Sequence, residues 1–376
     1  MASAARAQPP GSPAAAATGH RRRRPAVATA VHWALLLAAV AYVGYAAPAL
    51  FRSVQDGGRW LHELRWWWVA VALVLILVSI ATYGELQRRL LAVGGAQTPG
   101  ASVQAVTFAS NAIANTIPVV GGATAIAYAI SRFHRRGADP ALASWAALIA
   151  GLVSTLCLVV LGAAGLALAG TVPLGPAVLV TVATVAVSIL GWHLISHPAV
   201  LGNVLAPALR TVRRTPASCE QCRSGWADDI ARTVADVTGR IALLRPGARR
   251  WLWITGLAAV SWGLDFVALS ASAYAVLGQV PWTAVVEAFL VVQASIALQV
   301  LPGGAGLAEV GLVGIFASGT PAGAAAVVAV VYRSVSWLLP SVVGWVVYAR
   351  QIHTLGPASD RHGPAVTGQP ARPVAA

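Results

Sequence analysis

Residues 66–83 read WWWVAVALVLILVSIATY, an unbroken apolar run without a charged side chain. A helix rises about 1.5 Å per residue, so about 20 apolar residues cross the hydrocarbon core of a bilayer. The length of the run, rather than its composition alone, argues against the core of a soluble domain. It predicts a membrane-spanning helix.

Five further runs of similar length lie on either side of it, at residues 26–51, 141–169, 177–195, 251–277 and 324–348. The first exceeds the roughly 7–15 apolar residues of a secretory signal, so we expect a retained span. Only 10% of the residues are charged, whereas soluble domains carry about 25%. The sequence therefore predicts an all-α polytopic integral membrane protein with about six full spans.

The segments outside these runs are polar. Residues 1–25 are rich in Ala, Pro and Ser and end in four arginines, which predicts a disordered basic tail. Residues 26–350 form the predicted membrane domain, and residues 351–376 a disordered C-terminal tail. The loop at 197–250 contains apolar residues at steps of three and four between Trp226 and Leu244, which predicts an amphipathic helix. This helix either lies in the membrane interface or packs against the span ends.

The arginines set the predicted orientation, because basic loops stay cytoplasmic. With the N-terminus inside, 22 of the 26 arginines fall in cytoplasmic segments and three in outer loops. We therefore expect a multi-pass protein of the plasma membrane with both termini in the cytoplasm. Arginine without lysine, and abundant Ala, Gly and Pro, are typical of a high-GC bacterium. The net charge of +14 is explained by loops that face anionic lipid, and it predicts no nucleic-acid partner.

Two apolar segments are interrupted by Pro and Gly, which weaken or break helices. Residues 103–131 contain Pro118, Gly121 and Gly122, and residues 284–318 contain Pro302, Gly303 and Gly304. Each is predicted to form a re-entrant hairpin of two arms. The arms of the second segment are longer, which leaves two thin spans open there.

The two broken segments occupy matching places in the chain. Gly137 and Ser154 are 17 positions apart, as are Gly319 and Ser336. Each hairpin lies between two spans, which gives one repeat at about residues 66–169 and a second at about 251–348. The predicted topology orients the repeats oppositely. Inverted repeats with broken helices point to a transport site near the midplane, although Gly and Pro also kink ordinary spans.

Few ionisable residues lie deep in the predicted spans, and each is costly there. Asp265 and Arg333 lie within spans, Glu309 follows the second break, and Glu287 lies near the outer end of the arm before it. Arg333 can pair with Glu309 or Asp265. Two hypotheses follow: a polar cavity in which Arg333 meets a lipid phosphate, or a buried structural ion pair.

The first half carries no matching carboxylate. Its polar residues are Asn111, Asn115, Thr124, Ser144 and Ser154. Hydrogen bonds between helices explain most of them without a ligand. The basic stretch from Arg132 to Arg136 is interpreted as an orienting cluster, with phosphate contact as the alternative.

Cys219 and Cys222 form a CxxC that combines with His193 and His197 into a zinc-like spacing. A metal site, a redox pair and incidental loop cysteines all remain open, and the last is favoured because no second CxxC exists. We expect no metal and no cofactor. The sequence contains no phosphate-binding loop, zinc-protease motif or nucleophile elbow.

The second break and its surroundings carry a family resemblance. Leu301-Pro302-Gly303-Gly304-Ala305-Gly306 with Glu309, then Gly319, Arg333, Leu339-Pro340 and Gly344, resembles the membrane region of lysylphosphatidylglycerol synthases and of their stand-alone, flippase-like relatives. A looser match runs through Asn115, Pro118, Gly121, Gly122 and Gly137. The resemblance covers roughly residues 30–350.

The chain departs from this pattern in its first half. Many relatives carry an acidic residue after the first turn, where this chain has Gly122 and Ala123. Many also carry a Glu-Arg pair and an Asp in the following span, where this chain reads IAGLVS at residues 149–154. A mechanism that needs charges in both halves is therefore not supported. The longest loop has no room for a soluble aminoacyl-transfer domain, so the resemblance implies lipid movement or lipid binding.

The sequence thus predicts a non-enzymatic, flippase-like lipid translocase for an anionic, aminoacylated or glycosylated lipid. The alternative is a non-transporting membrane scaffold for an enzyme of envelope synthesis, and a membrane enzyme is least favoured. Membrane lipids are the expected partners. The predicted substrate-contacting residues are Glu309, Arg333, Asp265, Pro302, Gly303, Gly304, Pro118 and Gly121.

Overall fold

The computed structural model describes residues 58–196, 247–298 and 301–354, and in these ranges the chain is helical without a strand. Several predictions concern residues outside these ranges. They are the N-terminal tail, the first span at 26–51, the helix at 226–244, the CxxC, and the part of the C-terminal tail that follows Thr354. Four described helices are long and apolar enough to cross a membrane. The all-helical membrane class is confirmed.

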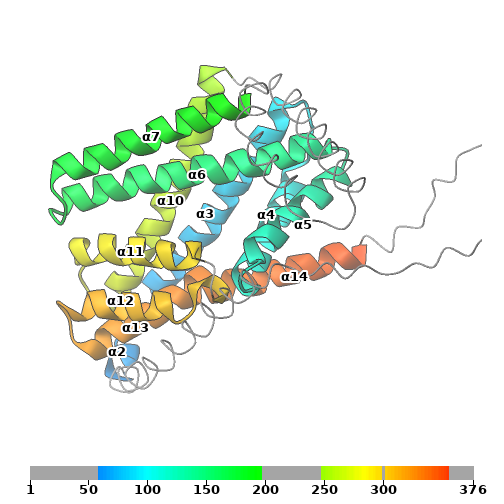
Figure 1. Ribbon diagram of the computed structural model, residues 1–376. Coiled ribbons are helices and arrows are strands. Elements are labelled where there is room, and N and C mark those ends of the chain that lie inside the picture. Colours follow the sequence, from blue (N-terminus) through cyan, green and yellow to red (C-terminus); the bar gives the residue numbers. More distant parts are fainter. Residues whose placement is uncertain (1–57, 197–246, 299–300, 355–376) are drawn as a thin grey trace, which may run out of the picture.

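Each unit begins with a long helix and continues into a broken pair. The first unit comprises α3 (Trp66–Val93), α4 (Gly100–Thr116), α5 (Gly121–His134) and α6 (Pro140–Leu168), preceded by the short α2 (Gly58–His62). The next helix, α7 (Leu174–Ser196), lies along α6 (Figure 1).

The second unit repeats this order. It comprises α10 (Ala248–Leu277), α11 (Trp282–Ala297), the 3-10 turn η1 (Pro302–Gly304) and α12 (Leu307–Ala317). Its last helix is divided into α13 (Ala322–Arg333), the π-helical turn η2 (Ser334–Leu338) and α14 (Leu339–Thr354).

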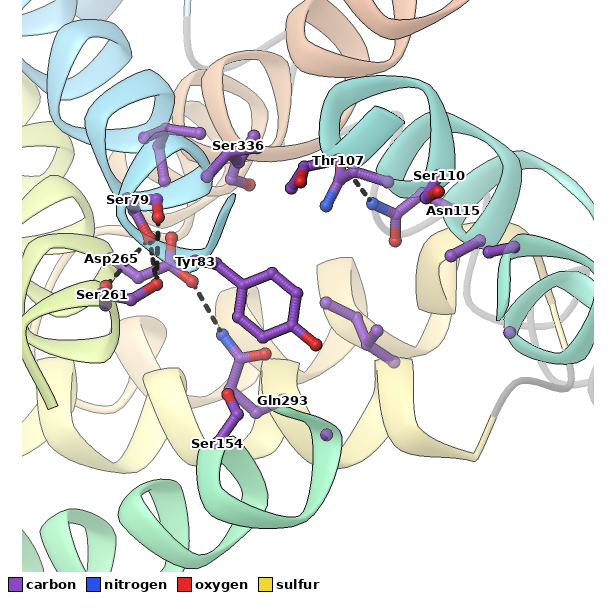
Figure 2. A pocket seen from close by; sticks show the side chains of 18 of the residues that line it. Ser79, Tyr83, Thr107, Ser110, Asn115, Ser154, Ser261, Asp265, Gln293 and Ser336 are labelled. Carbon is purple, nitrogen blue, oxygen red and sulfur yellow. Dashed lines mark hydrogen bonds between the residues drawn. The ribbon is translucent and has the colours of Figure 1, made fainter. Parts of the chain in front are cut away.

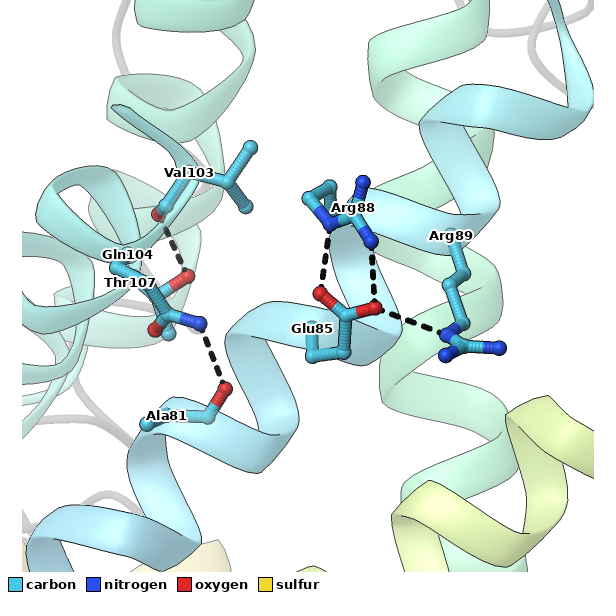
Figure 3. Close-up of polar contacts among 7 residues, drawn as sticks. All are labelled: Ala81, Glu85, Arg88, Arg89, Val103, Gln104 and Thr107. Atoms are coloured by element: carbon cyan, nitrogen blue, oxygen red, sulfur yellow. Dashed lines mark hydrogen bonds and ion pairs between the residues drawn. The ribbon is translucent and has the colours of Figure 1, made fainter. Parts of the chain in front are cut away.

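Several helices extend beyond their predicted limits. α3 continues to Val93, ten residues past its apolar run, because Glu85 pairs with Arg88 and Arg89 on the helix surface (Figure 3). α10 starts at Ala248, inside the predicted loop, and α14 continues to Thr354, inside the predicted tail. Hydropathy marks where a helix meets lipid, whereas helical hydrogen bonding continues into the polar region.

Both hairpins are broken, as predicted. Their arms have 17 and 14 residues in the first unit and 16 and 11 in the second. At about 1.5 Å per residue, all four fall short of a hydrocarbon core about 30 Å thick. The expectation of longer arms in the second hairpin was wrong, since α12 is the shortest arm. The short arms favour re-entrant hairpins over thin spans.

The two units are antiparallel, which their first helices show directly. The backbone N–H of Arg65 at the start of α3 donates to the carbonyl of Ala275 at the end of α10. At the other end, the Arg89 guanidinium lies 5.2 Å from the ring centroid of Trp253. Midway, the hydroxyls of Ser79 and Ser261 are 3.0 Å apart. The first helices therefore run side by side in opposite directions, as an inverted repeat requires.

The fold brings arginines from several helices to one end of the molecule. Arg89 reaches the N-terminal part of α10, and Arg136, beyond α5, donates to the carbonyl of Ser102 at the start of α4. The opposite end carries Trp66 and Trp282, which are 68% and 62% exposed, as expected of aromatic side chains at a membrane interface. We call these the arginine end and the tryptophan end; the arginine end is the one predicted to face the cytoplasm.

The apolar core consists of two clusters. One surrounds α10, α11, α12 and α13 and includes Leu269, Phe289 and Tyr332. The other joins the arginine ends of α3, α4, α5 and α6 and includes Leu86 and Trp145. Outside these clusters, large side chains such as Leu179 and Leu252 are 69% and 74% exposed, which fits a surface that faces lipid.

Candidate functional site

The second helix break is built from backbone conformations that suit glycine. Gly303, Gly304 and Gly306 have φ angles of 56°, 70° and 81°. A Cβ on Gly303 would lie 2.2 Å from the indole nitrogen of Trp337, and one on Gly304 would lie 2.9 Å from the backbone of Ser295. The break is therefore a tight turn pressed against α11 and η2.

The first break has the same position but a different residue. Pro118 is followed by Val119 at φ 63°, where the second unit has Pro302 followed by Gly303 at φ 56°. A β-branched residue is strained in this region. After the turn, a Cβ on Gly121 would lie 2.5 Å from the carbonyl oxygen of Ala114. α4 and α11 thus both end just before the Pro-containing breaks that the sequence predicted.

Arg333 links the turn of the second break to the start of α12. Its Nε donates to Glu309 Oε1 at 2.6 Å and its Nη2 to the carbonyl of Gly303 at 2.6 Å. The other carboxylate oxygen of Glu309 accepts from the backbone N–H of Gly306 at 2.5 Å. The guanidinium also lies 5.1 Å from the ring centroid of Trp337. The partner of Arg333 in the described chain is therefore Glu309 rather than Asp265.

Trp337 connects the two breaks. Its indole N–H donates at 3.0 Å to the carbonyl of Asn115, near the end of α4. The same ring lies against Arg333 and the turn at Gly303. Trp337 therefore contacts both breaks, and α4 of the first hairpin also packs directly against η1 of the second.

A cavity of about 460 Å³ lies between the two units, lined by both first helices, both hairpins and the last helices (Figure 2). It contains a notable density of polar side chains for a membrane interior. These are Ser79, Tyr83, Gln87, Thr107, Ser110, Asn111, Asn115, Ser154, Thr155, Ser261, Asp265, Gln293, Arg333 and Ser336.

Asp265 is the carboxylate of this cavity. Its Oδ2 accepts a long hydrogen bond of 3.5 Å from Gln293, and no ion pair to it is found among the described residues. Next to it, Ser79 and Ser261 donate to each other's backbone carbonyls at 2.9 and 3.1 Å. Because Arg333 already pairs with Glu309, Asp265 is a carboxyl group of the cavity lining without a cationic partner among the described residues.

The cavity lies on the axis of the repeat. Ser79 and Ser261 are 182 positions apart, and their reciprocal hydrogen bonds are what a two-fold axis between them would give. Further pairs of lining residues have the same spacing: Tyr83 and Asp265, Asn111 and Gln293, Gly151 and Arg333, and Ser154 and Ser336.

The cavity is nevertheless one-sided. Gln87, Thr107 and Ala147 line it toward the arginine end. The residues 182 positions later are Leu269, Phe289 and Ala329, which are 0%, 6% and 2% exposed in the packed core toward the tryptophan end. A perfectly symmetric interface would have an equivalent cavity toward the tryptophan end. In this protein, apolar side chains fill that space.

The predicted site residues divide into two groups. Asp265 and Arg333 line the cavity. Glu309, Pro302, Gly303, Gly304, Pro118 and Gly121 are not among its lining residues and instead shape or brace the two breaks. Contact of any of these residues with a substrate stays a prediction.

Sequence reasoning missed several lining residues, including Tyr83, Gln87 and Gln293. The constant spacing of 182 positions was the signal that could have found Gln293 from Asn111. Of the polar residues noted in the first half, Asn111, Asn115 and Ser154 line the cavity. Thr124 and Ser144 instead donate to carbonyls of their own helices or the adjacent turn.

The family model described as the lysylphosphatidylglycerol synthase TM region matches residues 26–344, which include the first unit, most of the second unit and every residue that lines the cavity. This chain belongs to the lysylphosphatidylglycerol synthase transmembrane-region family. A search of curated proteins found no match. Within this family member, the structure gives a physical reason for the Pro302 turn, for its Arg333–Glu309 brace, and for Gly344, where a Cβ would lie 2.3 Å from the carbonyl oxygen of Phe108.

Proposed function

We propose that this family member moves an amphiphilic lipid between leaflets, with the polar head in the central cavity and the acyl chains in the bilayer. The observation that carries the proposal is a polar cavity on the axis of two antiparallel, broken-helix units. Broken helices at the interface of inverted repeats are how many transporters build a midplane site. No chemical change of the lipid is proposed.

The charges favour particular head groups. Arg333 is 5% exposed, and its Nε and Nη2 donate to Glu309 and Gly303, so a phosphate that took these two donors would have to displace the brace. Asp265 has no cationic partner in the described chain and would attract an amine. The remaining amides and hydroxyls suit a hydroxyl-rich head. An aminoacylated or glycosylated lipid therefore fits better than a lipid held through Arg333 by its phosphate.

Reconstituted liposomes test the proposal. Fluorescently labelled aminoacylated, glycosylated and unmodified anionic lipids are followed with an impermeant reductant that quenches the outer leaflet. Asp265→Asn is expected to slow flipping of the amine-bearing lipid about tenfold, the loss of roughly one charge-assisted hydrogen bond. Glu287→Gln removes the same charge from a residue outside the cavity lining and should leave the rate unchanged. Rates equal to those of empty liposomes for every lipid would defeat the translocase.

The alternative is a scaffold that holds a lipid for an envelope-synthesis enzyme without moving it. The one-sided cavity favours it, because the apolar core at Leu269 and Phe289 offers a polar head no path to the tryptophan end. A scaffold would bind lipid in an Asp265-dependent manner with no flipping above the lipid-only control.

A further inference from the structure

The arginine end holds a polar cluster separate from the cavity, where α5 meets the last turns of α14. We call it the Arg132 cluster and define it by Tyr128, Arg132, Tyr348 and Gln351. Tyr128 donates its hydroxyl to Gln351 Oε1 at 2.8 Å, and its ring centroid lies 5.3 Å from that of Tyr348. None of these residues lines the cavity.

Arg132 is buried, unlike the other described arginines at this end, and no ion pair to it is found among the described residues. It is 9% exposed, and its contact in the cluster is with the face of Tyr128, 5.2 Å from the ring centroid. By comparison, Arg88 and Arg89 share Glu85 on the surface. Stacking on a ring uses the face of a guanidinium and leaves its in-plane N–H groups to bind an acceptor.

Gln351 contributes a buried donor that has no acceptor. It is 7% exposed, and its Nε2 has no hydrogen-bond partner, because the hydroxyl of Tyr128 engages the other amide atom. Buried donors normally find an acceptor. Among the described residues, the Arg132 guanidinium meets Tyr128 and no carboxylate, and Gln351 Nε2 has no acceptor, so the two groups beside the same phenol suit one species: an oxygen-rich anion.

We infer that the Arg132 cluster binds a phosphate group, with a phospholipid phosphodiester and free phosphate as the two sources of that chemistry. Arginine's planar fork matches phosphate oxygens in two-point contact, and Gln351 supplies a further donor. Arg132 lies one helical turn beyond Ala129, the last residue of α5 that lines the cavity. The site is therefore at the arginine end, beside the cavity and independent of transport.

Ligand-induced thermal stabilisation of the purified full-length chain in neutral detergent tests the site. The probes are dioctanoyl phosphatidylglycerol, inorganic phosphate and dioctanoylglycerol, which lacks the phosphate. Phosphatidylglycerol is expected to raise the melting temperature saturably, and dioctanoylglycerol is not. The same Arg132-dependent rise with inorganic phosphate assigns the site to free phosphate, and a rise with the lipid alone assigns it to a head group. Either result supports phosphate binding.

Matched variants make the test specific. Arg132→Gln should weaken the apparent affinity at least about tenfold. Arg135→Gln removes the same charge from an exposed neighbour and should change it less than twofold. Gln351→Glu places a carboxylate in the cluster and should also abolish binding, which covers the case in which Arg132→Gln fails to fold.

Equal responses of Arg132→Gln and Arg135→Gln, or equal stabilisation by dioctanoylglycerol, would overturn the inference. Micelles permit no movement between leaflets, so a failed flipping assay would not affect this result.

Discussion

Arg333 and Glu309 illustrate how a buried charge in a membrane protein can be structural and still border a site. Glu309→Gln would leave Arg333, 5% exposed, without its counter-charge. Removing one partner of a buried pair costs about 3 kcal/mol at the lower end of measured values, which suits a carboxylate that is 24% exposed. The free energy of unfolding in detergent, followed by tryptophan fluorescence, measures this loss.

The surface pair of α3 gives the control at the residue scale. Glu85→Gln removes the partner of Arg88, whose side chain is 41% exposed, and should cost less than about 1 kcal/mol. In the Glu309→Gln/Arg333→Gln double variant, the destabilisation should be smaller than the sum of the single effects. Additive single effects would show that the brace contributes little coupling.

At the scale of elements, the two helix breaks are equivalent in place and unequal in strain. Gly303→Ala puts a Cβ 2.2 Å from Trp337 Nε1 at φ 56° and should destabilise the protein by about 2–3 kcal/mol. Val119→Gly relieves a valine at φ 63° and should stabilise it by up to about 1 kcal/mol. The melting temperatures of both variants check these two predictions. A higher melting temperature for Gly303→Ala, or a lower one for Val119→Gly, would contradict the turn conformations described above.

At the scale of the whole molecule, the interface between the units is filled toward the tryptophan end and hollow toward the arginine end. Ala147→Cys, in the cavity lining, should react with an impermeant thiol reagent applied from the arginine end. Ala329→Cys, its counterpart 182 positions later and 2% exposed, should react from neither side. Mass spectrometry of labelled vesicles of both orientations, on a background without Cys157, Cys219 and Cys222, gives the readout.

Labelling of Ala329→Cys from the tryptophan end would contradict a closed interface at that end. Labelling that occurs only during lipid turnover would instead be expected of alternating access, since a transporter must also open the half of the interface that is packed here.

Among the described residues, the sequence by itself determined the long apolar helices, their two breaks and the antiparallel order of the units. Apolar runs and Pro–Gly interruptions act locally, and arginine placement gives an orientation that needs no contacts. The limits of α3, α10 and α14 were underestimated by three to ten residues, because hydropathy ends before helical hydrogen bonding does.

The tertiary structure alone decided which charges pair and which residues face the cavity. Arg333 and Glu309 are 24 positions apart and meet because the turn at residues 318–321 folds α13 back along α12. Asp265 could have been the partner on composition, yet it faces Gln293 across the cavity. Pairing depends on how helices cross and on which face each presents, and neither property is contained in the apolar periodicity of one segment.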